Sequence, residues 1–345
     1  MKVAIITDQH FGMRKGSKIF HEFIGKFYND TFFPYLEENN IDTVLDLGDT
    51  FDNRRNIDLW SLEWAKNNYF SRLEEMGITV HTIVGNNTAY YKNTNKINTI
   101  DLLLQQYNNI ITYDSPTDVT IGGLKILFVP WINEENRIAT ETLLKKSKAT
   151  VCMGHLELAG FEAHPGYSHI NGESPDKYKR FKKVFSGHYH TKSTKGNITY
   201  LGNPYQIYWN DYGDRRGFHI FDTESLGLKY VKNPYTIFNK VMYDDNTYHT
   251  TEDFDDFKDQ YVKIIVQEKS NYLTFDKFIE GVYHGGAHDV KIIENFDLNA
   301  EEDDWVEVED TLTTLEKYVT DLETDMDKEN IKSILKTLYV EASQV

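Results

Sequence analysis

Five short polar patterns, each placed directly after an apolar run, constrain the fold of this chain more than any other feature. Apolar runs bounded by polar residues are typical of buried strands, and ligand sites form where strand ends meet at one edge of a sheet. One such pattern alone is weak, because it arises easily by chance. Together they predict a metal site at a sheet edge. The patterns are Asp8-Gln9-His10, Gly48-Asp49-Thr50-Phe51-Asp52, Gly85-Asn86-Asn87-Thr88, Gly154-His155 and Gly187-His188-Tyr189-His190.

Short β-branched runs alternate with helical patterns over residues 1–233, which indicates a layered α/β domain. The expected strands are VAIIT, TVLDL, TVHTIV, KILFVPW, TVCMG, KVFSG, ITYLG and FHIFD. After residue 233 the runs YVKIIVQ, FDKFIEGVYH and DVKIIEN predict a strand, a helix and a strand. We therefore expect a second, small α+β domain over residues 234–296.

The C-terminal part reads as an acidic linker, residues 297–310, followed by a helical segment, residues 311–345. Helices this short are marginal alone and should dock on something, either a partner groove or the body of this chain. The segment carries two apolar stripes at helical spacing. Their residues are Leu312, Leu315, Val319 and Leu322 in the first stripe, and Ile331, Ile334, Leu335 and Leu338 in the second.

Charge and cysteine content narrow the class of protein. The net charge of −17 at first argues against a nucleic-acid partner, but residues 294–345 contain 16 acidic residues and 4 lysines, so the acidity belongs mainly to the tail. Cys152 is the only cysteine, so no disulfide forms within the chain and a metal must be bound by His, Asp and Asn. No run approaches a membrane span, so we expect a cytoplasmic protein.

One helix is predicted between the second and third strands, in LWSLEWAKNNYFSRLEEMG, closed by Gly77. On a helical wheel, Leu59, Leu62, Ala65 and the apolar residues after them fall on the core side. Trp60 and Trp64 fall on the opposite side. Two tryptophans on a polar face favour a contact surface for self-association, with packing under a neighbouring loop as the alternative.

The five patterns contain the parts of a two-metal hydrolytic centre. Asp49 is the expected bridge between two divalent ions, with Asp8, His10 and His190 completing one shell and Asn86, His155 and His188 the other. Oxygen and nitrogen donors without a thiolate suit Mn, Fe or Zn better than Ca or Mg. Because such a centre lowers the pKa of bound water and so supplies a nucleophile, the expected substrate is a phosphate ester.

The series of motifs resembles that of the calcineurin-like metallophosphoesterases, which reads D-x-H, G-D-x-x-D, G-N-H-D or G-N-H-E, G-H and G-H-x-H. Within that superfamily the chain is most similar to the SbcD-type double-strand-break repair nucleases, the recombination endonuclease subunits of T4-like bacteriophages in particular. Beyond the motifs, the likeness includes GDTFDNRR, EEMGITVHTIVGN, VPWINEEN, GHLELAGF, FSGHYHT, RGFHIFDTE and LYVEA. It extends over nearly the whole chain and is weakest over residues 235–300.

The resemblance implies a four-layer α/β/β/α sandwich with a small capping domain, and a Mn²⁺-dependent exonuclease and endonuclease acting on DNA ends. It also implies an SMC-like ATPase partner of the Rad50 or SbcC type, bound by the C-terminal helices. A homodimer through helices flanking the third motif is implied as well, which agrees with outward Trp60 and Trp64.

The third motif departs from the family pattern. The family's His stands beside the scissile phosphate and is oriented by the acid after it, whereas this chain has Asn87 and Thr88 there. An amide cannot act as a general acid, although its NH2 can donate to phosphate. Three interpretations remain open: a slow nuclease helped by water or by His164 or His169, an inactive subunit that still binds DNA, or a misaligned motif in which Asn86 is no ligand.

DNA contacts are predicted from basic residues near the motifs. Arg54 and Arg55 follow the bridging motif closely enough to reach a phosphate. Basic residues interleaved with Tyr178 and Phe181 precede the last motif and could form a strip beside the metals, or a solvated helix face. The strip is Lys177, Lys179, Arg180, Lys182 and Lys183.

Two other functions compete with the nuclease. A phosphatase or nucleotide phosphodiesterase of the same superfamily would share the metal motifs but needs no C-terminal helix pair. A DNA-end-binding scaffold would keep the ligands and lack turnover. Activity on DNA with and without a restored Asn87→His/Thr88→Asp motif separates these functions.

Overall fold

The computed structural model describes residues 1–164, 167–168, 172–246, 254–294 and 319. The chain divides into two compact units, residues 1–238 and 239–345. This division falls close to residue 233, where the sequence pattern changes. The acidic linker and, apart from Val319, the C-terminal stripes lie outside the described residues.

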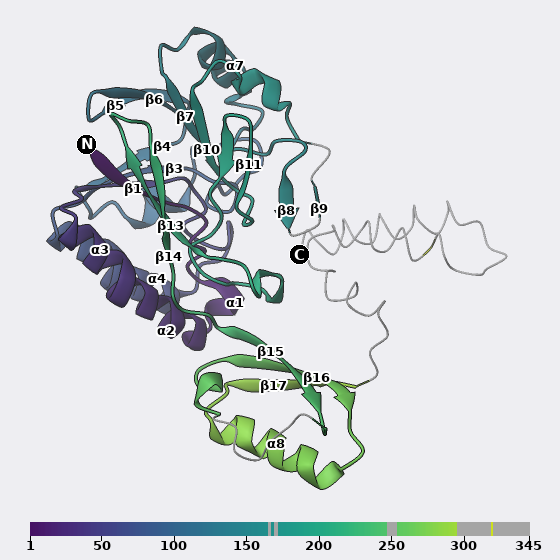
Figure 1. Ribbon diagram of the computed structural model, residues 1–345. Coiled ribbons are helices and arrows are strands. Elements are labelled where there is room, and N and C mark those ends of the chain that lie inside the picture. Colours follow the sequence, from purple (N-terminus) through teal and green to yellow (C-terminus); the bar gives the residue numbers. More distant parts are fainter. Residues whose placement is uncertain (165–166, 169–171, 247–253, 295–318, 320–345) are drawn as a thin grey trace. The chain divides into compact units, whose positions relative to one another are not determined.

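Two six-stranded mixed sheets form the first unit (Figure 1). In the first sheet, β1, β2, β3 and β4 run parallel to one another, β13 pairs antiparallel with β1, and β14 pairs antiparallel with β13. In the second sheet, β6, β7, β10 and β12 are parallel and β5 and β11 are antiparallel edges. All the strands expected from the sequence form. The first sheet has the order β14 (Leu228–Lys232), β13 (Gly217–Asp222), β1 (Lys2–Ile6), β2 (Thr43–Asp46), β3 (Thr79–Ile83), β4 (Ile110–Tyr113); the second has β11 (Ser193–Lys195), β12 (Ile198–Tyr200), β10 (Lys183–Gly187), β7 (Val151–His155), β6 (Leu124–Val129), β5 (Thr117–Ile121).

The two sheets share one apolar core. Val3 and Leu45 from the first sheet pack with Phe128, Met153 and Phe185 from the second, all of them buried. Burial on both faces explains why these strands read as continuous apolar runs rather than alternating ones.

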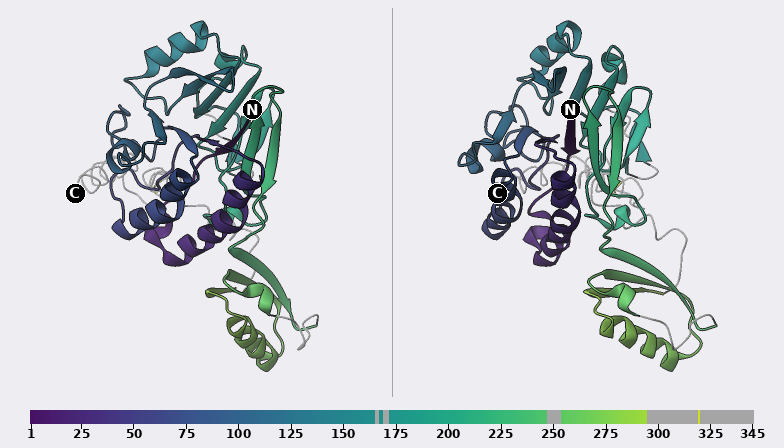
Figure 2. Two further views of the ribbon diagram at one scale, coloured as in Figure 1. Left: turned by 90° about the vertical axis from the view of Figure 1, so that its left-hand side faces the viewer. Right: turned by 60° about the vertical axis from the view of Figure 1, so that its left-hand side comes forward.

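Helices cover the outer face of each sheet (Figure 2). Phe27 and Phe32 pack on Phe218 of β13, so the helical layer lies over the first sheet. Leu144 of α7 packs with Leu127 and Cys152 on the other side of the second sheet. The layers are thus helix, sheet, sheet, helix. The helices are α1 (Met13–Gly16), α2 (Lys18–Phe27), α3 (Phe33–Glu38), α4 (Leu59–Ala65), α5 (Ser71–Glu75), α6 (Thr99–Leu103) and α7 (Arg137–Lys146), with π-helical turns at Tyr28–Phe32 and Lys66–Phe70.

The helix between β2 and β3 corrects the predicted placement of the tryptophans. Leu59 is 80% exposed, whereas the rings of Trp60 and Trp64 are only partly exposed and each lies 5.0 Å from the His21 ring of α2. The cause is the π-helical turn Lys66–Phe70, which adds a residue to one turn and rotates everything before it relative to a 3.6-residue wheel. Trp60 and Trp64 thus pack on His21 and stay partly exposed, and a dimer through them remains a prediction.

The second unit contains a small sheet covered by one helix. Its strands have the order β15 (Phe238–Asp244), β16 (Tyr261–Glu268), β17 (Asp289–Ile293), and α8 (Tyr272–His284) connects the parallel pair β16 and β17. Val262 and Ile264 pack on Phe275, Phe278 and Val282 of α8. The expected strand, helix and strand after residue 233 therefore form.

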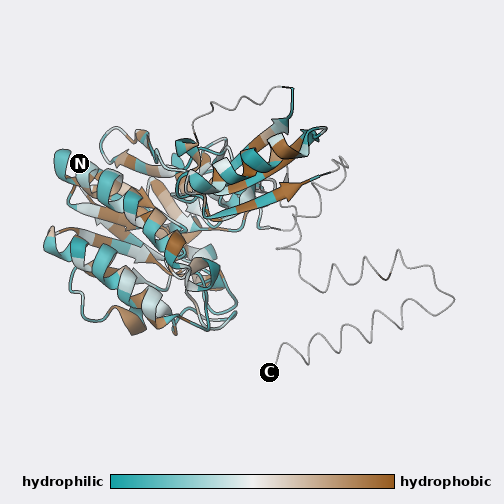
Figure 3. Cartoon of the chain, turned by 90° about the horizontal axis from the view of Figure 1, so that it is seen from below, coloured by the Kyte–Doolittle hydropathy of each residue, from teal (hydrophilic) through white to brown (hydrophobic). Residues whose placement is uncertain are grey.

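Hydropathy follows this layering (Figure 3): the strands are largely hydrophobic, and the outer faces of the helices are largely hydrophilic. In the part of the chain that the structure describes, every helix is too short or too polar to cross a membrane.

Buried His219 in β13 makes the stability of the first unit depend on pH. Burial lowers its pKa to about 3, with a smaller contribution from Lys192, so the folded chain keeps it neutral while the unfolded chain protonates it near pH 6.5. Its stabilising effect is present above pH 6.5 and is lost as the pH falls towards 3.

We expect the free energy of unfolding to drop by about 2 kcal/mol more between pH 7.5 and 5 in the original chain than in His219→Phe, at about 1.4 kcal/mol per pH unit below 6.5. Urea unfolding of both chains at both pH values, with a chelator present, measures the difference. Equal pH dependence of the two chains would contradict this assignment.

Candidate metal centre

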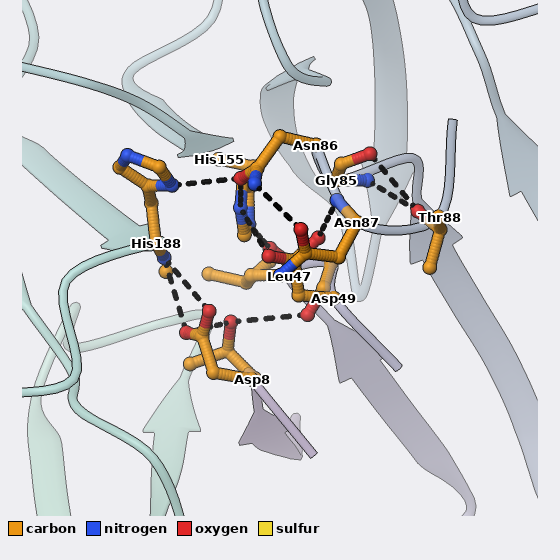
Figure 4. Close-up of polar contacts among 12 residues, drawn as sticks. Asp8, Leu47, Asp49, Gly85, Asn86, Asn87, Thr88, His155 and His188 are labelled. Atoms are coloured by element: carbon orange, nitrogen blue, oxygen red, sulfur yellow. Dashed lines mark hydrogen bonds and ion pairs between the residues drawn. The ribbon is translucent and has the colours of Figure 1, made fainter. Parts of the chain in front are cut away.

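The carboxyl ends of parallel strands from both sheets bring the predicted ligands together. Asp8 follows β1, Asp49 follows β2 and Asn86 follows β3, while His155 ends β7 and His188 follows β10. His190 lies two residues further on. Figure 4 shows the side chains of Asp8, Asp49, Asn86 and His155 meeting beside His188.

The first group consists of Asp8, His10 and His190, whose ligand atoms lie within 4.8 Å of one another. The Nε2 atoms of His10 and His190 are 3.0 Å apart. Asp52 Oδ1 lies 3.1 Å from His10 Nδ1, and although burial lowers the pKa of His10, this carboxylate raises it above its ordinary value. Asp52 thus orients His10, as second carboxylates often do for metal-binding histidines.

The second group consists of Asp49, His155 and His188, with the same close spacing of ligand atoms. Asn86 Oδ1 lies between the two rings, 2.9 Å from His155 Nε2 and 2.8 Å from His188 Nδ1. The carbonyl of Leu47 accepts a hydrogen bond from His155 Nδ1 at 2.8 Å, which directs Nε2 to the centre. Since Asn86 lies inside the site, the interpretation of a misaligned third motif was wrong.

Asp49 is buried between these groups. Its Oδ2 lies 3.3 Å from His155 Nε2, and its Oδ1 accepts a hydrogen bond from the backbone N–H of Asn87 at 2.8 Å. Burial opposes ionisation of Asp49, but the ion pair with His155 outweighs it and lowers the carboxyl pKa. Burial lowers the pKa of His155, but the charges of Asp49 and Asp8 and the hydrogen bonds to Asp49 and Leu47 together raise it, to about 9. Binding of a metal ion to this ring requires its neutral form.

Four of these residues have left-handed backbone conformations, with φ of 52° at Asp8, 49° at His10, 52° at Asp49 and 85° at His188. Such conformations cost of the order of 1–3 kcal/mol each and persist where surrounding contacts fix them. Gly85 leaves room for the Asp49 carboxylate, because a Cβ at this position would overlap Asp49 Oδ1.

A buried polar network beneath the ligands provides such contacts. Gln9 Nε2 donates to Asp46 Oδ2 at 3.0 Å and Thr50 Oγ1 donates to the same oxygen at 2.7 Å. Tyr28 donates to Gln9 Oε1 and Tyr205 to the Gln9 carbonyl, both at 2.5 Å. The network joins the loop of Asp8 and His10 to the loop of Asp49. Sequence reasoning missed Gln9 and Asp46 as site residues, since they look like ordinary spacers in and beside the motifs.

The third-motif loop keeps its shape without the family's acid. Thr88 is fully buried, and its hydroxyl accepts from the Gly85 N–H at 2.8 Å and donates to the Gly85 carbonyl at 3.0 Å. Thr88 therefore closes the turn instead of orienting Asn87. Asn87 Oδ1 accepts from Asn86 Nδ2 at 3.1 Å, which turns Asn86 Oδ1 towards the histidines.

The predicted basic strip does not lie beside the metals. The strip lies at the start of β10, whose first residue is Lys183, whereas His188 and His190 follow the last residue of β10, Gly187. A strand of five residues places its start about 16 Å from its end. Lys177 pairs with Glu141 at 3.1 Å, and Arg180 donates to carbonyls at the C-terminal end of α7. Tyr178 and Phe181 are core residues, so their alternation with lysines reflects burial.

Arg54 and Arg55 differ from each other. The Arg54 guanidinium lies over the Trp131 ring, 5.4 Å from its centroid, and although partial burial lowers its pKa, the charge of Asp49 acts on it in the opposite direction. Arg55 is exposed.

His164 lies in the hairpin of β8 (Glu162–His164) and β9 (Tyr167–Ser168), while His169 lies outside the described residues.

Comparison with known proteins identifies the class. The family model of the calcineurin-like phosphoesterases matches residues 1–192, and this chain belongs to that family. Along its whole length it is 35% identical to exonuclease subunit 1 of Enterobacteria phage T4, over 352 residues and 100% of each chain. The resemblance drawn from the motifs is confirmed. A solved archaeal phosphodiesterase matches 67% of this chain and 99% of its own, with 14% identity and a TM-score of 0.35, too low to bear on function.

The residues present fit two divalent metal ions. Each group offers one carboxylate and two imidazoles. The Nε2 atoms of His10 and His190 approach each other, and His155 Nε2 and His188 Nδ1 approach the same amide oxygen of Asn86. Convergence of such atoms in a buried site is costly unless a cation lies among them. The structure thus provides two adjacent candidate metal sites.

Proposed function

We propose that this chain is the nuclease subunit of a DNA double-strand-break repair and recombination complex, an exonuclease and endonuclease that hydrolyses phosphodiesters at DNA ends. The observation that carries the proposal is the full-length similarity to the phage exonuclease subunit. The convergence of the candidate ligands at one sheet edge supports it, because phosphodiester hydrolysis is chemistry that paired metal ions perform.

Two divalent ions would be held by these residues, and Mn²⁺ is the ion we expect. Asp8, His10 and His190 would hold one and His155, His188 and Asn86 the other, with Asp49 shared between them. Mixed nitrogen and oxygen donors suit Mn, Fe or Zn, and the resemblance to the SbcD-type nucleases favours Mn²⁺ among them. When bound, such ions supply a hydroxide nucleophile and neutralise charge on the phosphate.

The protein's own residues orient this centre. The Leu47 carbonyl fixes the ring of His155 and Asp52 fixes that of His10, while the backbone N–H of Asn87 holds Asp49. Since Asn87 cannot give up a proton, the leaving oxygen would take its proton from water, and we expect slow turnover.

A partner is implied by the word subunit in the name of the phage relative. We propose an SMC-like ATPase of the Rad50 or SbcC type, bound by the two C-terminal stripes. Of these, Val319 is described, as a buried helical residue. The small unit after residue 238 would act as the capping domain.

A DNA-end-binding scaffold is the second candidate. The amide at Asn87 and the hydroxyl of Thr88, engaged with the Gly85 backbone, favour it, since neither group titrates near neutral pH. A scaffold of this kind would keep the metals and the DNA but not the turnover.

End-labelled duplex DNA incubated with Mn²⁺, with and without the ATPase subunit of the same genome, tests the proposal. If the chain is a nuclease, the label should be lost slowly, a chelator should stop the loss, and the ATPase should accelerate it. DNA binding without cleavage under every condition would establish the scaffold instead. Hydrolysis of nucleotide monoesters or small diesters with no binding of DNA would point to another phosphoesterase activity.

A further inference from the structure

Two arginines lie against aromatic rings beside the metal centre, one next to each group. Arg14 lies over Tyr208 with its guanidinium carbon 5.0 Å from the ring centroid, and the Tyr208 ring is nearly parallel to that of His190, 6.3 Å away. Arg54 lies over Trp131 and within electrostatic reach of Asp49. His190 belongs to the first group and Asp49 to the second.

The backbone holds both arginine and aromatic partners in place. Arg14 has a left-handed conformation, φ 53°, and its Nε donates to the Ile207 carbonyl at 3.0 Å, which leaves its terminal nitrogens for another ligand. Trp131 donates its backbone N–H to the carbonyl of Val84, directly before the third motif, at 2.8 Å. The contacts fix each guanidinium relative to the metal ligands.

Neither charge is neutralised by a carboxylate partner within the described part of the chain, and Arg54 Nη1 is a buried atom without a hydrogen-bond acceptor there. The basic strip before β10 is different, because Lys177 and Lys179 pair with acidic neighbours. A guanidinium that lies over an aromatic ring can still direct N–H donors to a phosphate in the fork geometry that suits it.

We propose that Arg14 and Arg54 bind the phosphates of the DNA strand on the two flanks of the metal centre. The ligand class is the sugar-phosphate backbone, contacted without reading of base sequence. This inference rests on the proposed function in that the strand held at the centre is DNA. It replaces the strip of residues 177–183 as the electrostatic contact near the metals.

The salt dependence of DNA binding tests the proposal. We expect Arg14→Gln and Arg54→Gln each to weaken binding of a fluorescein-labelled duplex of about 30 base pairs by about tenfold or more, and to reduce the slope of log K against log salt by about 0.9. Ca²⁺ replaces Mn²⁺ to prevent cleavage, and anisotropy is measured with the full chain on two unrelated DNA sequences. Arg14→Lys should restore the slope but only part of the affinity, because it keeps the charge and loses the fork.

Lys182→Gln is the matched control, because it removes one exposed positive charge at the opposite end of β10. It should leave slope and affinity unchanged. Unchanged binding in both arginine variants, or an equal loss in Lys182→Gln, would overturn the proposal. If the original chain hydrolyses bis(p-nitrophenyl) phosphate but binds no DNA, the proposed function itself fails and this inference with it. Circular dichroism of each variant verifies that it is folded.

Discussion

Asn87→His is expected to raise the rate of DNA cleavage in Mn²⁺ by about 10²- to 10⁴-fold, the usual contribution of a positioned general acid. Apart from the hydrogen bond to Asn86, the hydrogen bonds described for this loop do not involve the Asn87 side chain. Its backbone N–H holds Asp49, and the Thr88 hydroxyl holds Gly85. In the imidazolium form that acts as the acid, both ring nitrogens donate. Nε2 can therefore supply the proton, while Nδ1 gives up the acceptor role that Asn87 Oδ1 has towards Asn86, and the contacts of Asn86 Oδ1 with His155 and His188 have to keep Asn86 in place.

Single-turnover cleavage of an end-labelled duplex, measured from about pH 5.5 to 8.5, on either side of the ordinary histidine pKa, checks this prediction. Asn87→His should lose activity at high pH as the imidazole deprotonates, and the original chain should lack that decline. Asn87→Ala is the control: it gains no acid and removes the acceptor that orients Asn86, so Mn²⁺ affinity should fall about 10- to 100-fold. Equal rates for the original chain and Asn87→His would show that the absent acid does not limit this site.

The position of the metal centre could be predicted from the sequence because it depends on strand direction. Each motif follows an apolar run, and parallel strands of one sheet end at the same edge. The structure adds that the carboxyl ends of both sheets meet, since β1, β2 and β3 belong to one sheet and β7 and β10 to the other. The predicted division of the ligands agrees with the two groups in the structure, with Asp8, His10 and His190 in one and His155 and His188 in the other. Chain order alone does not give this division, because His190 is the last ligand in the sequence and joins the first two.

The contacts that fix the ligands could not be predicted, because they cross between distant loops. The sequence between Gln9 and Asp46 contains the helices α1, α2 and α3, and the two side chains meet only in the folded chain. The same holds for Arg14, whose neighbours Ile207 and Tyr208 lie at least 193 residues later in the sequence. Nothing in the local pattern around Arg14 distinguishes it from a solvated basic residue.

Local geometry explains why two positions in the structure differ from what the sequence pattern indicated. A helical wheel assumes 3.6 residues in every turn, and the π-helical turn at Lys66–Phe70 breaks that assumption directly after Ala65. The strip of residues 177–183 is close to His188 in sequence, but an extended strand lies between them. Residues that are near each other in sequence can still lie far apart when an extended strand separates them, and β10 is such a strand.

Asp49→Asn is expected to abolish activity, with a loss of at least about 10³-fold, because we propose this carboxylate as the ligand shared by two metal ions, and several kcal/mol of charge stabilisation depends on those ions. The substitution changes charge rather than shape, and the acceptor for the Asn87 N–H can be kept through the amide oxygen. The expected primary defect is therefore in metal binding, with Mn²⁺ stoichiometry falling below two in calorimetric titration.

Thermal unfolding separates this effect from general damage. A ligand at about 100 times its Kd stabilises the folded chain by about 2.7 kcal/mol, so Mn²⁺ should raise the Tm of the original chain and leave that of Asp49→Asn nearly unchanged. Asp52→Asn provides the graded comparison, since Asp52 touches only the far side of the His10 ring and its loss should cost about 10- to 100-fold in affinity. Two bound Mn²⁺ ions and a full Tm shift in Asp49→Asn would exclude a shared carboxylate, and the two groups would then have to work as separate sites.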